Sequence, residues 1–528
     1  MKRDMYLEKK KLEGNLYLKG LLFNIIFLII LIISMLNINY FNEAGNSRCK
    51  NIINSNQEND NFQVHLKEDD IEDSIHNSQY GLLEGEDSHN QIQNSILYLR
   101  FLSIGHHRTF WLLDFNNWSY YKINATLISI GEKCYIYMED YCIRELGDQL
   151  VAEKGERICN EFDYKIYPRV IDLAGNPNGT LGDIDGDPRI IILLSHNPIS
   201  YYDQRNELQL DYSNLCEMFH IYYKTWTPTI AHEFHHLIWF NNEMDEPHFT
   251  LEALAEYSTC HAGYLTQYNN LNPQSSFFLA HPEDSLLYWN MLNSVDYGGA
   301  YLFAFYIAEH YGVSILKNLI KEPTDGANGI QNVLKFAGYN ITFNELYMNW
   351  ITALTLDEIG FMSNLYGFVN LDARVTKYTN VKFPLTNDKI KLYYYGFDVQ
   401  KIITPQDNFT IEIQKDQDKT IGLSIAFHDA IGWHIIQNLN NKGIKLITEN
   451  IFGLDIEVLY LITSYIFDQI PSLPTENGLG PYTYIEISIS NLKEDSAIIF
   501  LTITGSSILG LIICIIFIIR YHLQKKIE

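Results

Sequence analysis

The chain has 528 residues, of which 47% are hydrophobic and 14% aromatic, enough apolar material for more than one folded domain. Its formal net charge of −26 speaks against nucleic acid and anionic membrane surfaces as partners, because like charges repel, and it suits a secreted or surface protein. The composition also excludes a chain that is disordered overall.

The first segment combines a basic start with a long apolar run. Lysines and an arginine are spread over residues 1–19, and GLLFNIIFLIILIISMLNINYF follows. A run of this length can cross a bilayer, and no A-x-A cleavage pattern comes after it. Residues 1–41 are therefore predicted to be a signal peptide or an uncleaved signal-anchor, and both alternatives export the rest of the chain.

Residues 42–95 are polar and acidic, as in LKEDDIEDS, and they show no sustained hydrophobic period. Such a composition predicts a solvated linker or a pro-segment. Cys49 lies in this segment and could mask a metal ion in a zymogen, but an unpaired or bridging cysteine is the simpler interpretation.

Short alternating runs begin at residue 96. ILYLRFL, RTFWLLDF, YKINATLISIG and KCYIYME predict strands of an N-terminal sheet, residues 151–163 predict a helix, and the apolar run Arg189 to Ser195 predicts a further strand.

Three aspartates precede that last strand in the sequence GDIDGDP. Asp183, Asp185 and Asp187 have the alternate spacing of a calcium loop, but the glutamate that such a loop carries at its far end is missing. A plain polar turn is favoured, and a Ca²⁺ site is the alternative.

The stretch TPTIAHEFHHLIWFNN predicts a helix with Thr227 as N-cap and Pro228 at the first helical position. His232 and His236 are four residues apart and share one face, so both imidazoles can bind one metal ion, with Glu233 beside the metal's water. The alternative is a buried amphipathic helix that happens to contain histidines.

A zinc site needs a third protein ligand and leaves the fourth position to water. A third histidine at the usual spacing is absent, because Trp239 and Asn242 occupy the positions where glycine and histidine are required. Instead, LEALAEY follows Thr250, a second expected N-cap, and places Glu252 and Glu256 on one helical face.

These motifs resemble those of the gluzincins, zinc metallopeptidases whose third ligand opens a motif N-E-[GA]-x-[AS]-[DE]. Glu252 matches the ligand, Glu256 matches the carboxylate that orients a ligating histidine, and Leu251 departs from the pattern. The order of NATLISIGEKCYIYMED, EFDYKIYP, GDIDGDPRIIILL, IAHEFHHLI, LEALAEY and YGGAYLFAFYIAEHYG resembles the hyicolysin-like metallopeptidases, and more faintly immune inhibitor A, over roughly residues 96–358.

The resemblance implies an α+β, zincin-type domain at residues 96–358 that acts as a secreted endopeptidase on proteins or peptides. It implies one catalytic Zn²⁺ held by His232, His236 and Glu252, with Glu233 as general base. In zincins a sheet edge beside the active-site helix binds extended substrate by strand addition, and Arg189 to Ser195 is the expected edge strand. A zinc aminopeptidase is an alternative, although no G-x-M-E-N segment is present, and so is a surface adhesion or binding protein that retains the protease fold.

After these motifs, residues 297–312, 314–319 and 343–356 predict helices of a lower subdomain beneath the cleft. Tyr297 or Tyr301 could supply a phenol to an oxyanion, but core tyrosines are the simpler interpretation.

Residues 359–380 are a connecting segment, and residues 381–492 return to short alternating strands that predict an antiparallel β-sandwich-like domain.

The chain ends in a second apolar run. Residues 497–519 are uncharged and are closed by Arg520, which predicts a transmembrane helix with a cytoplasmic tail at residues 520–528. The protein is therefore expected in the cell membrane, with an extracellular ectodomain.

The chain has seven cysteines, of which six are expected outside the bilayer. They allow one or two disulfides, but the sequence does not indicate which cysteines pair. Five N-x-[ST] triplets are compatible with export: Asn117, Asn124, Asn178, Asn340 and Asn408.

Overall fold

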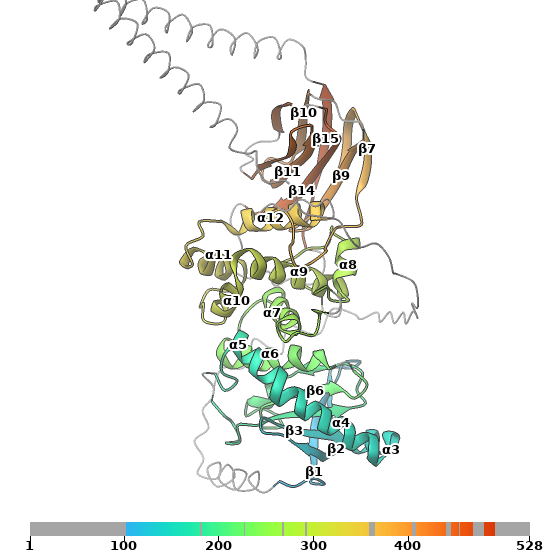
Figure 1. The fold of residues 1–528 in the computed structure, drawn as a ribbon, viewed down its shortest axis with the longest axis vertical. Coiled ribbons are helices and arrows are strands. Elements are labelled where there is room, and N and C mark those ends of the chain that lie inside the picture. The colour runs from blue at the N-terminus through green and yellow to red at the C-terminus, as the bar shows by residue number, and fades with distance from the viewer. Residues whose placement is uncertain are drawn as a thin grey trace, which may run out of the picture. The chain divides into compact units, whose positions relative to one another are not determined.

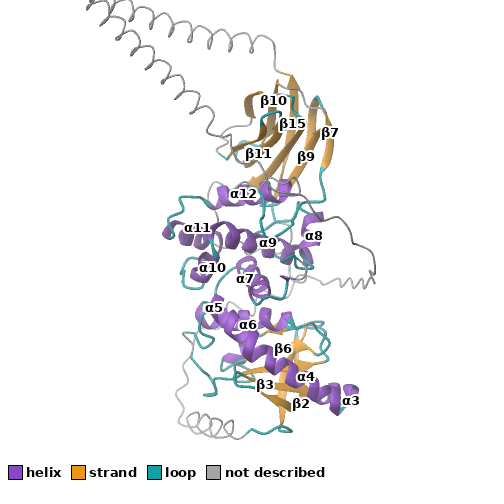
Figure 2. Ribbon diagram, viewed as in Figure 1, coloured by secondary structure: helices purple, strands orange, loops and turns teal. Residues whose placement is uncertain are grey.

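A computed structural model describes residues 102–179, 182–225, 227–266, 269–290, 293–357, 365–403, 408–439, 445–452, 455–467 and 480–491. This part of the chain is a mixed α+β structure (Figure 1, Figure 2). The expected signal segment, the polar segment at 42–95 and the expected transmembrane helix at 497–519 lie outside the described residues. Within the described ranges, no helix is long and apolar enough to cross a membrane.

The first part is a six-stranded sheet with the strand order β1-β2-β3-β4-β6-β5. Strands β3, β4 and β6 are parallel, and the other neighbours are antiparallel. The expected strands RTFWLLDF, YKINATLISIG and KCYIYME are confirmed as β1, β2 and β3. The bounds are β1 His107–Asp114, β2 Ser119–Ile130, β3 Cys134–Glu139, β4 Ile190–Ser195, β5 Tyr201–Tyr202 and β6 Met218–Tyr222.

The expectation that Arg189 to Ser195 forms the edge of the sheet is wrong. Strand β4 is bonded to β3 on one side and to β6 on the other, so its backbone has no free edge for a substrate. All of its residues are buried, and a strand buried on both faces reads as an uninterrupted apolar run. The edge on this side is the two-residue strand β5, which is antiparallel to β6 and contacts α6.

Helices cover one face of this sheet. Ile136 and Leu194 of the sheet share an apolar cluster with Phe162 and Phe234 of the helices, whereas the opposite face carries a separate cluster. The helix expected at 151–163 is confirmed as α4, and it continues through one π-helical turn into α5 (Figure 1). The helices are α3 Asp140–Leu146, α4 Asp148–Glu161, η1 Phe162–Ile166, α5 Tyr167–Ala174 and α6 Pro228–Asn242.

The outer edge of β1 is bonded to side chains. The amide of Asn214 accepts from the Trp111 N–H at 2.8 Å and donates to the Trp111 carbonyl at 3.0 Å. The Leu113 N–H donates to the Tyr201 hydroxyl at 2.8 Å, and the Asn197 amide donates to the Leu113 carbonyl at 2.9 Å. Tyr201 belongs to β5, and Asn197 and Asn214 come from the segments before and after it, so these residues lie along the outer side of β1.

The second part is helical. The expected helices are found as α9, which ends before Gly312 with its φ of 95°, α10, and α12, which starts with a capping box formed by Thr342 and Glu345. Helix α9 packs closely on the start of α8, because a Cβ on Gly298 would lie 2.3 Å from the Gln274 carbonyl oxygen. The helices are α7 His248–His261, α8 Ser275–Ala280, α9 Ser294–Tyr311, α10 Val313–Leu319, α11 Gly326–Phe336 and α12 Phe343–Leu356.

The third part consists of two sheets, β13-β10-β15-β8 and β12-β11-β14-β9-β7, whose buried residues belong to one apolar cluster. Helix α12 contacts the second sheet, where Thr352 Oγ1 donates to Ser424 Oγ at 2.9 Å. The run IKLYYYGFDV belongs to two strands, β8 and β9, which are separated by residues 394–396. The strands are β7 Thr379–Lys382, β8 Leu385–Tyr393, β9 Phe397–Ile403, β10 Asn408–Lys415, β11 Thr420–Asp429, β12 Gly432–Asn438, β13 Lys445–Phe452, β14 Val458–Ile466 and β15 Tyr482–Asn491.

The described cysteines are thiols. Cys134 of β3 and Cys159 of α4 have their sulphur atoms 3.7 Å apart.

Candidate metal centre

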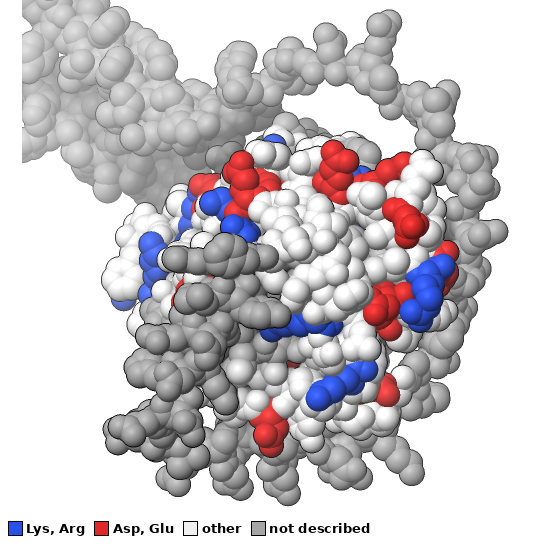
Figure 3. All heavy atoms as spheres, turned by 90° about the horizontal axis from the view of Figure 1, so that it is seen from below, with Lys and Arg blue, Asp and Glu red and all other residues white. Residues whose placement is uncertain are grey.

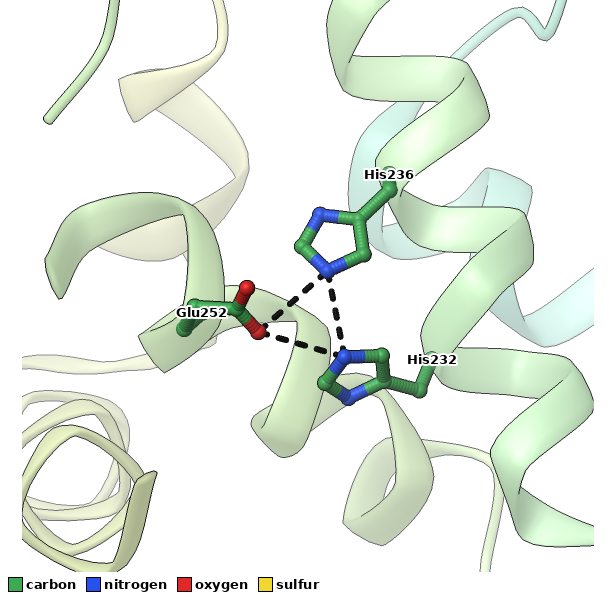
Figure 4. Close-up of side chains that lie close together, drawn as sticks. All are labelled: His232, His236 and Glu252. Carbon is green, nitrogen blue, oxygen red and sulfur yellow. Dashed lines mark hydrogen bonds and ion pairs between the residues drawn. The ribbon is translucent and has the colours of Figure 1, made fainter. Parts of the chain in front are cut away.

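Helix α6 carries both histidines of the H-E-x-x-H motif. It begins at Pro228, as expected, while Thr227 holds the N-cap position without a side-chain capping bond. The helical period brings His232 and His236 to one face, where their Nε2 atoms are 3.1 Å apart (Figure 4). Both nitrogens point away from α6 toward α7.

Helix α7 supplies the carboxylate that faces them. Glu252 Oε2 is 3.2 Å from Nε2 of His232 and 3.3 Å from Nε2 of His236 (Figure 4). The helix starts at His248 after the extended residue Pro247, so the expectation that Thr250 is the N-cap is wrong. Proline has no backbone N–H and is tolerated where a helix begins, so Pro247 sets the start three residues earlier than expected.

The charges of these groups reinforce one another. Burial alone would lower the pKa of His232, but the carboxylates of Glu252 and Glu256 raise it well above its ordinary value. Burial alone would raise the pKa of Glu252, but the charges and hydrogen bonds of His236 and His232 hold it below its ordinary range. The pocket between α6 and α7 thus stabilises a positive charge next to an ionised carboxylate.

Glu233 follows His232 on α6 and is only 5% exposed. Burial raises the pKa of its carboxyl group, while the two imidazoles oppose this shift. A backbone hydrogen bond from Tyr202 also lowers the pKa of Glu233, which ties this carboxylate to the edge strand β5.

A series of buried polar groups contacts Nδ1 of His232, the ring nitrogen that does not face Glu252. Glu256 Oε1 lies 3.4 Å from His232 Nδ1, and Glu256 Oε2 accepts from the Asn272 amide at 2.9 Å. Asn272 Oδ1 in turn accepts from the Ser275 N–H at 2.8 Å. Glu256 was expected to orient a histidine, whereas Asn272 and Ser275 were missed. Their signal in the sequence is only that Asn-Pro precedes α8.

A cleft of about 370 Å³ opens beside these residues. Its walls include His232, Glu233 and Glu256 together with Tyr297, whose ring centroid is 6.4 Å from that of His232. Burial, and then the nearby glutamates, raise the pKa of Tyr297 well above its ordinary value, so its phenol keeps a proton to donate. Tyr301 is fully buried and donates to the Asn270 carbonyl, so it is a core residue.

The aspartates of GDIDGDP separate into two groups. Asp183 and Asp185 lie together with Glu217, while Asp187 accepts from the Tyr135 hydroxyl at 2.7 Å.

The donor atoms of His232, His236 and Glu252 fit a tetrahedral zinc ion. Ligands about 2.0–2.1 Å from zinc in a tetrahedron are separated by about 3.3–3.4 Å. The three separations here are 3.1, 3.2 and 3.3 Å, which is close to the triangular face of such a tetrahedron. Glu252 Oε2 is buried and meets the two imidazole nitrogens as ion pairs, without a hydrogen bond of regular geometry in the described part of the chain. These residues could therefore hold a metal ion.

No known protein-family pattern and no curated protein matches the chain. Among solved structures, the chain is similar to a surface-associated copper-binding protein of Methylomicrobium album BG8, with 8% identity, coverage of 22% of this chain and 98% of that chain, and a TM-score of 0.16. It is also similar to the pre-peptidase C-terminal domain of a collagenase from Bacillus anthracis, with 16% identity, coverage of 22% and 97%, and a TM-score of 0.14. At these TM-scores, neither structure defines the fold or function of this chain.

Proposed function

We propose that the chain is a zinc-dependent endopeptidase anchored in the cell membrane, with His232, His236 and Glu252 as zinc ligands. The observation that carries this proposal is the triangle of two imidazole nitrogens and one carboxylate oxygen, all within 3.3 Å, beside a buried glutamate and an open cleft. Three ligands with a free fourth position are typical of catalytic rather than structural zinc sites. The gluzincin-like order of motifs in the sequence supports the same class.

When bound, Zn²⁺ supplies a Lewis acid that lowers the pKa of a water molecule and polarises a carbonyl group. Glu233 takes the proton of the attacking water and later donates it to the leaving amine. Glu256 holds the Nδ1–H of His232, which directs Nε2 toward the ligand triangle. The Tyr297 phenol lines the cleft and is available to donate a hydrogen bond to the developing oxyanion.

The substrate is proposed to be an extended peptide. Strand β5 is the rim of the sheet beside α6 in the described part of the chain, and its Tyr202 backbone hydrogen-bonds Glu233, so a peptide that lies along this rim reaches the general base. The exclusion of nucleic acid as a partner stays an expectation from the net charge of −26. On the face drawn in Figure 3, acidic and basic side chains are interspersed, and the described residues form no extended basic patch there.

The test is the substitution Glu233→Gln in the detergent-solubilised full chain. The amide keeps the size of the side chain but cannot take a proton, so kcat for an N-terminally acetylated peptide should fall by roughly 10² to 10⁴-fold with little change in KM. Zinc content, measured by mass spectrometry, should persist. The matched control is Glu246→Gln, a buried glutamate that accepts from the Gly326 N–H at 2.9 Å outside the cleft.

Near-normal hydrolysis by Glu233→Gln with zinc bound would show that Glu233 is not the base. Hydrolysis of free but not acetylated peptides by the wild type would indicate an aminopeptidase. A zinc-loaded wild type without any hydrolysis would indicate a binding protein.

The proposed membrane location rests on the apolar runs at 1–41 and 497–519. Exposed side chains at Asn117, Asn124 and Asn340 are compatible with glycosylation outside the cell. External protease should therefore release the ectodomain from intact cells, while a C-terminal tag stays protected. A tag that is accessible from outside would contradict this orientation.

A further inference from the structure

A second group of acidic side chains, which shares no residue with the zinc ligands, lies where β4 and β6 begin. Asp183 and Asp185 belong to the turn before β4, and Glu217 directly precedes β6. One carboxylate oxygen of each lies within 4.8 Å of the others. Asp185 is 7% exposed and Glu217 only 2%. Three carboxylates therefore converge at a largely buried place.

One of these oxygens has no partner. Glu217 Oε1 accepts from the Ile184 N–H at 2.7 Å, which aims the carboxylate at the turn. Glu217 Oε2 is buried and accepts no hydrogen bond from the described residues. A buried charged oxygen without a partner is unfavourable, and native proteins satisfy such groups with a donor or a cation.

Within the described part of the chain, no lysine, arginine or histidine forms an ion pair with these three carboxylates. The charge of Arg108 acts on Asp185, but the guanidinium donates to the Asn214 carbonyl at 2.6 Å rather than to a carboxylate of the cluster. Glu207 adds a further negative charge near Glu217. Without a cation, the carboxylates are thus held in an unfavourable state.

We propose that Asp183, Asp185 and Glu217 bind one Ca²⁺ ion that joins the start of β4 to the start of β6. The donors are all carboxylate oxygens, which favour a hard cation over zinc or copper. The spacing of Asp183 and Asp185 is that of a calcium loop, and the glutamate that the local sequence lacks comes instead from the neighbouring strand. Backbone carbonyls and water would complete the 6 to 8 oxygens that Ca²⁺ requires.

The backbone already holds the ligands in place. The Gly186 N–H donates to Asp183 Oδ1 at 2.5 Å, and the Asp187 N–H donates to Asp185 Oδ1 at 2.9 Å. The Ile191 N–H donates to the Glu217 carbonyl at 2.9 Å, which fixes Glu217 beside the turn. Asp187 itself is not part of the site, because the Tyr135 hydroxyl occupies its carboxylate.

The two segments that the ion would join also bind the end of the active-site helix. Asn241, in the last turn of α6, donates to the Pro177 carbonyl at 2.8 Å and to Glu207 at 2.6 Å. Pro177 precedes the acidic turn, and Glu207 lies in the segment that leads to Glu217. The proposed Ca²⁺ therefore stabilises the support of α6 and takes no part in the chemistry, so it does not depend on the proposed peptidase activity.

The experiment is a calcium titration of the full chain in detergent after removal of calcium with EGTA. Thermal unfolding should shift upward by roughly 2–4 °C when free Ca²⁺ reaches about 100 times its Kd. Isothermal titration should give one site. Glu217→Gln and Asp183→Asn should lose the shift, while the neighbouring control Asp187→Asn should keep it.

An unchanged calcium shift in Glu217→Gln, or in Asp183→Asn where Glu217→Gln does not fold, would overturn the proposal, as would a wild type that binds no Ca²⁺. Zinc content is measured in parallel and should be the same in Glu217→Gln and wild type. The His236→Ala variant should keep the calcium-dependent rise in unfolding temperature, so the experiment tests the calcium proposal independently of the zinc proposal.

Discussion

The support of His232 by Glu256 can be tested by Glu256→Gln. In the wild type, Glu256 accepts at both oxygens, from His232 Nδ1 at 3.4 Å and from the Asn272 amide at 2.9 Å. Glutamine has one accepting oxygen, and its NH₂ group must face one of these two donors. An unsatisfied buried donor costs about 1–3 kcal/mol. Since about 1.4 kcal/mol is tenfold in an equilibrium constant, zinc affinity should fall roughly 10 to 100-fold.

The second variant, Asn272→Asp, should repair this loss in the background of Glu256→Gln. An aspartate at 272 accepts from the NH₂ group of Gln at 256 and still accepts from the Ser275 N–H. The double variant should recover about tenfold in zinc affinity, whereas Asn272→Asp alone places two carboxylates face to face and should weaken the site. A double-mutant cycle converts these zinc affinities into a coupling energy between positions 256 and 272.

The assay is competition for Zn²⁺ with a fluorescent chelator, with thermal unfolding as a check on folding. Glu246→Gln is again the control. Burial raises the pKa of Glu246 to about 8, so this side chain is already largely protonated at neutral pH and glutamine resembles it. Wild-type zinc affinity in Glu256→Gln would refute the reasoning. So would a double variant no better than the single one.

Two further substitutions separate the tyrosines and test the packing of α9. Tyr297→Phe should lower kcat by roughly 10² to 10³-fold with zinc retained, as expected for loss of one oxyanion donor. Tyr301→Phe should leave kcat unchanged and should lower the free energy of unfolding by about 0.5–1.5 kcal/mol, because it loses the hydrogen bond to Asn270. Equal effects of the two substitutions on kcat would show that Tyr297 is not an oxyanion donor. Gly298→Ala should destabilise the chain by about 1–3 kcal/mol in urea unfolding, because its Cβ meets the Gln274 carbonyl, and an unchanged midpoint would show that α8 can move aside.

The sequence located the first two proposed ligands because helical geometry links residues that are four apart. The pairing of His232 and His236 could be predicted without knowledge of the rest of the fold. Glu252 required the resemblance to a family, since no local rule relates α6 to α7. Asn272 lies 16 residues beyond the Glu256 that it supports, and such contacts depend on tertiary packing.

The errors have similar causes. The apolar run before Ser195 predicted a strand correctly, but its position in the sheet depends on which strands pair with it. Glu217 lies beyond the reach of any loop pattern that contains Asp183, because a parallel neighbour strand brings it there. Thr250 is a residue type that commonly caps a helix, but the helix begins directly after the extended residue Pro247 and places Thr250 inside its first turn.

The side-chain bonds along β1 bear on how this sheet meets a second copy of the protein. A strand of eight residues at the rim of a sheet exposes a row of donors and acceptors to which a second molecule can add. The Asn214 amide already satisfies both backbone groups of Trp111, and Tyr201 and Asn197 satisfy those of Leu113. The opposite rim, β5, is only two residues long. Within the described residues, neither rim of this sheet therefore presents a long uninterrupted row of unpaired backbone groups to which a strand of a second copy could add.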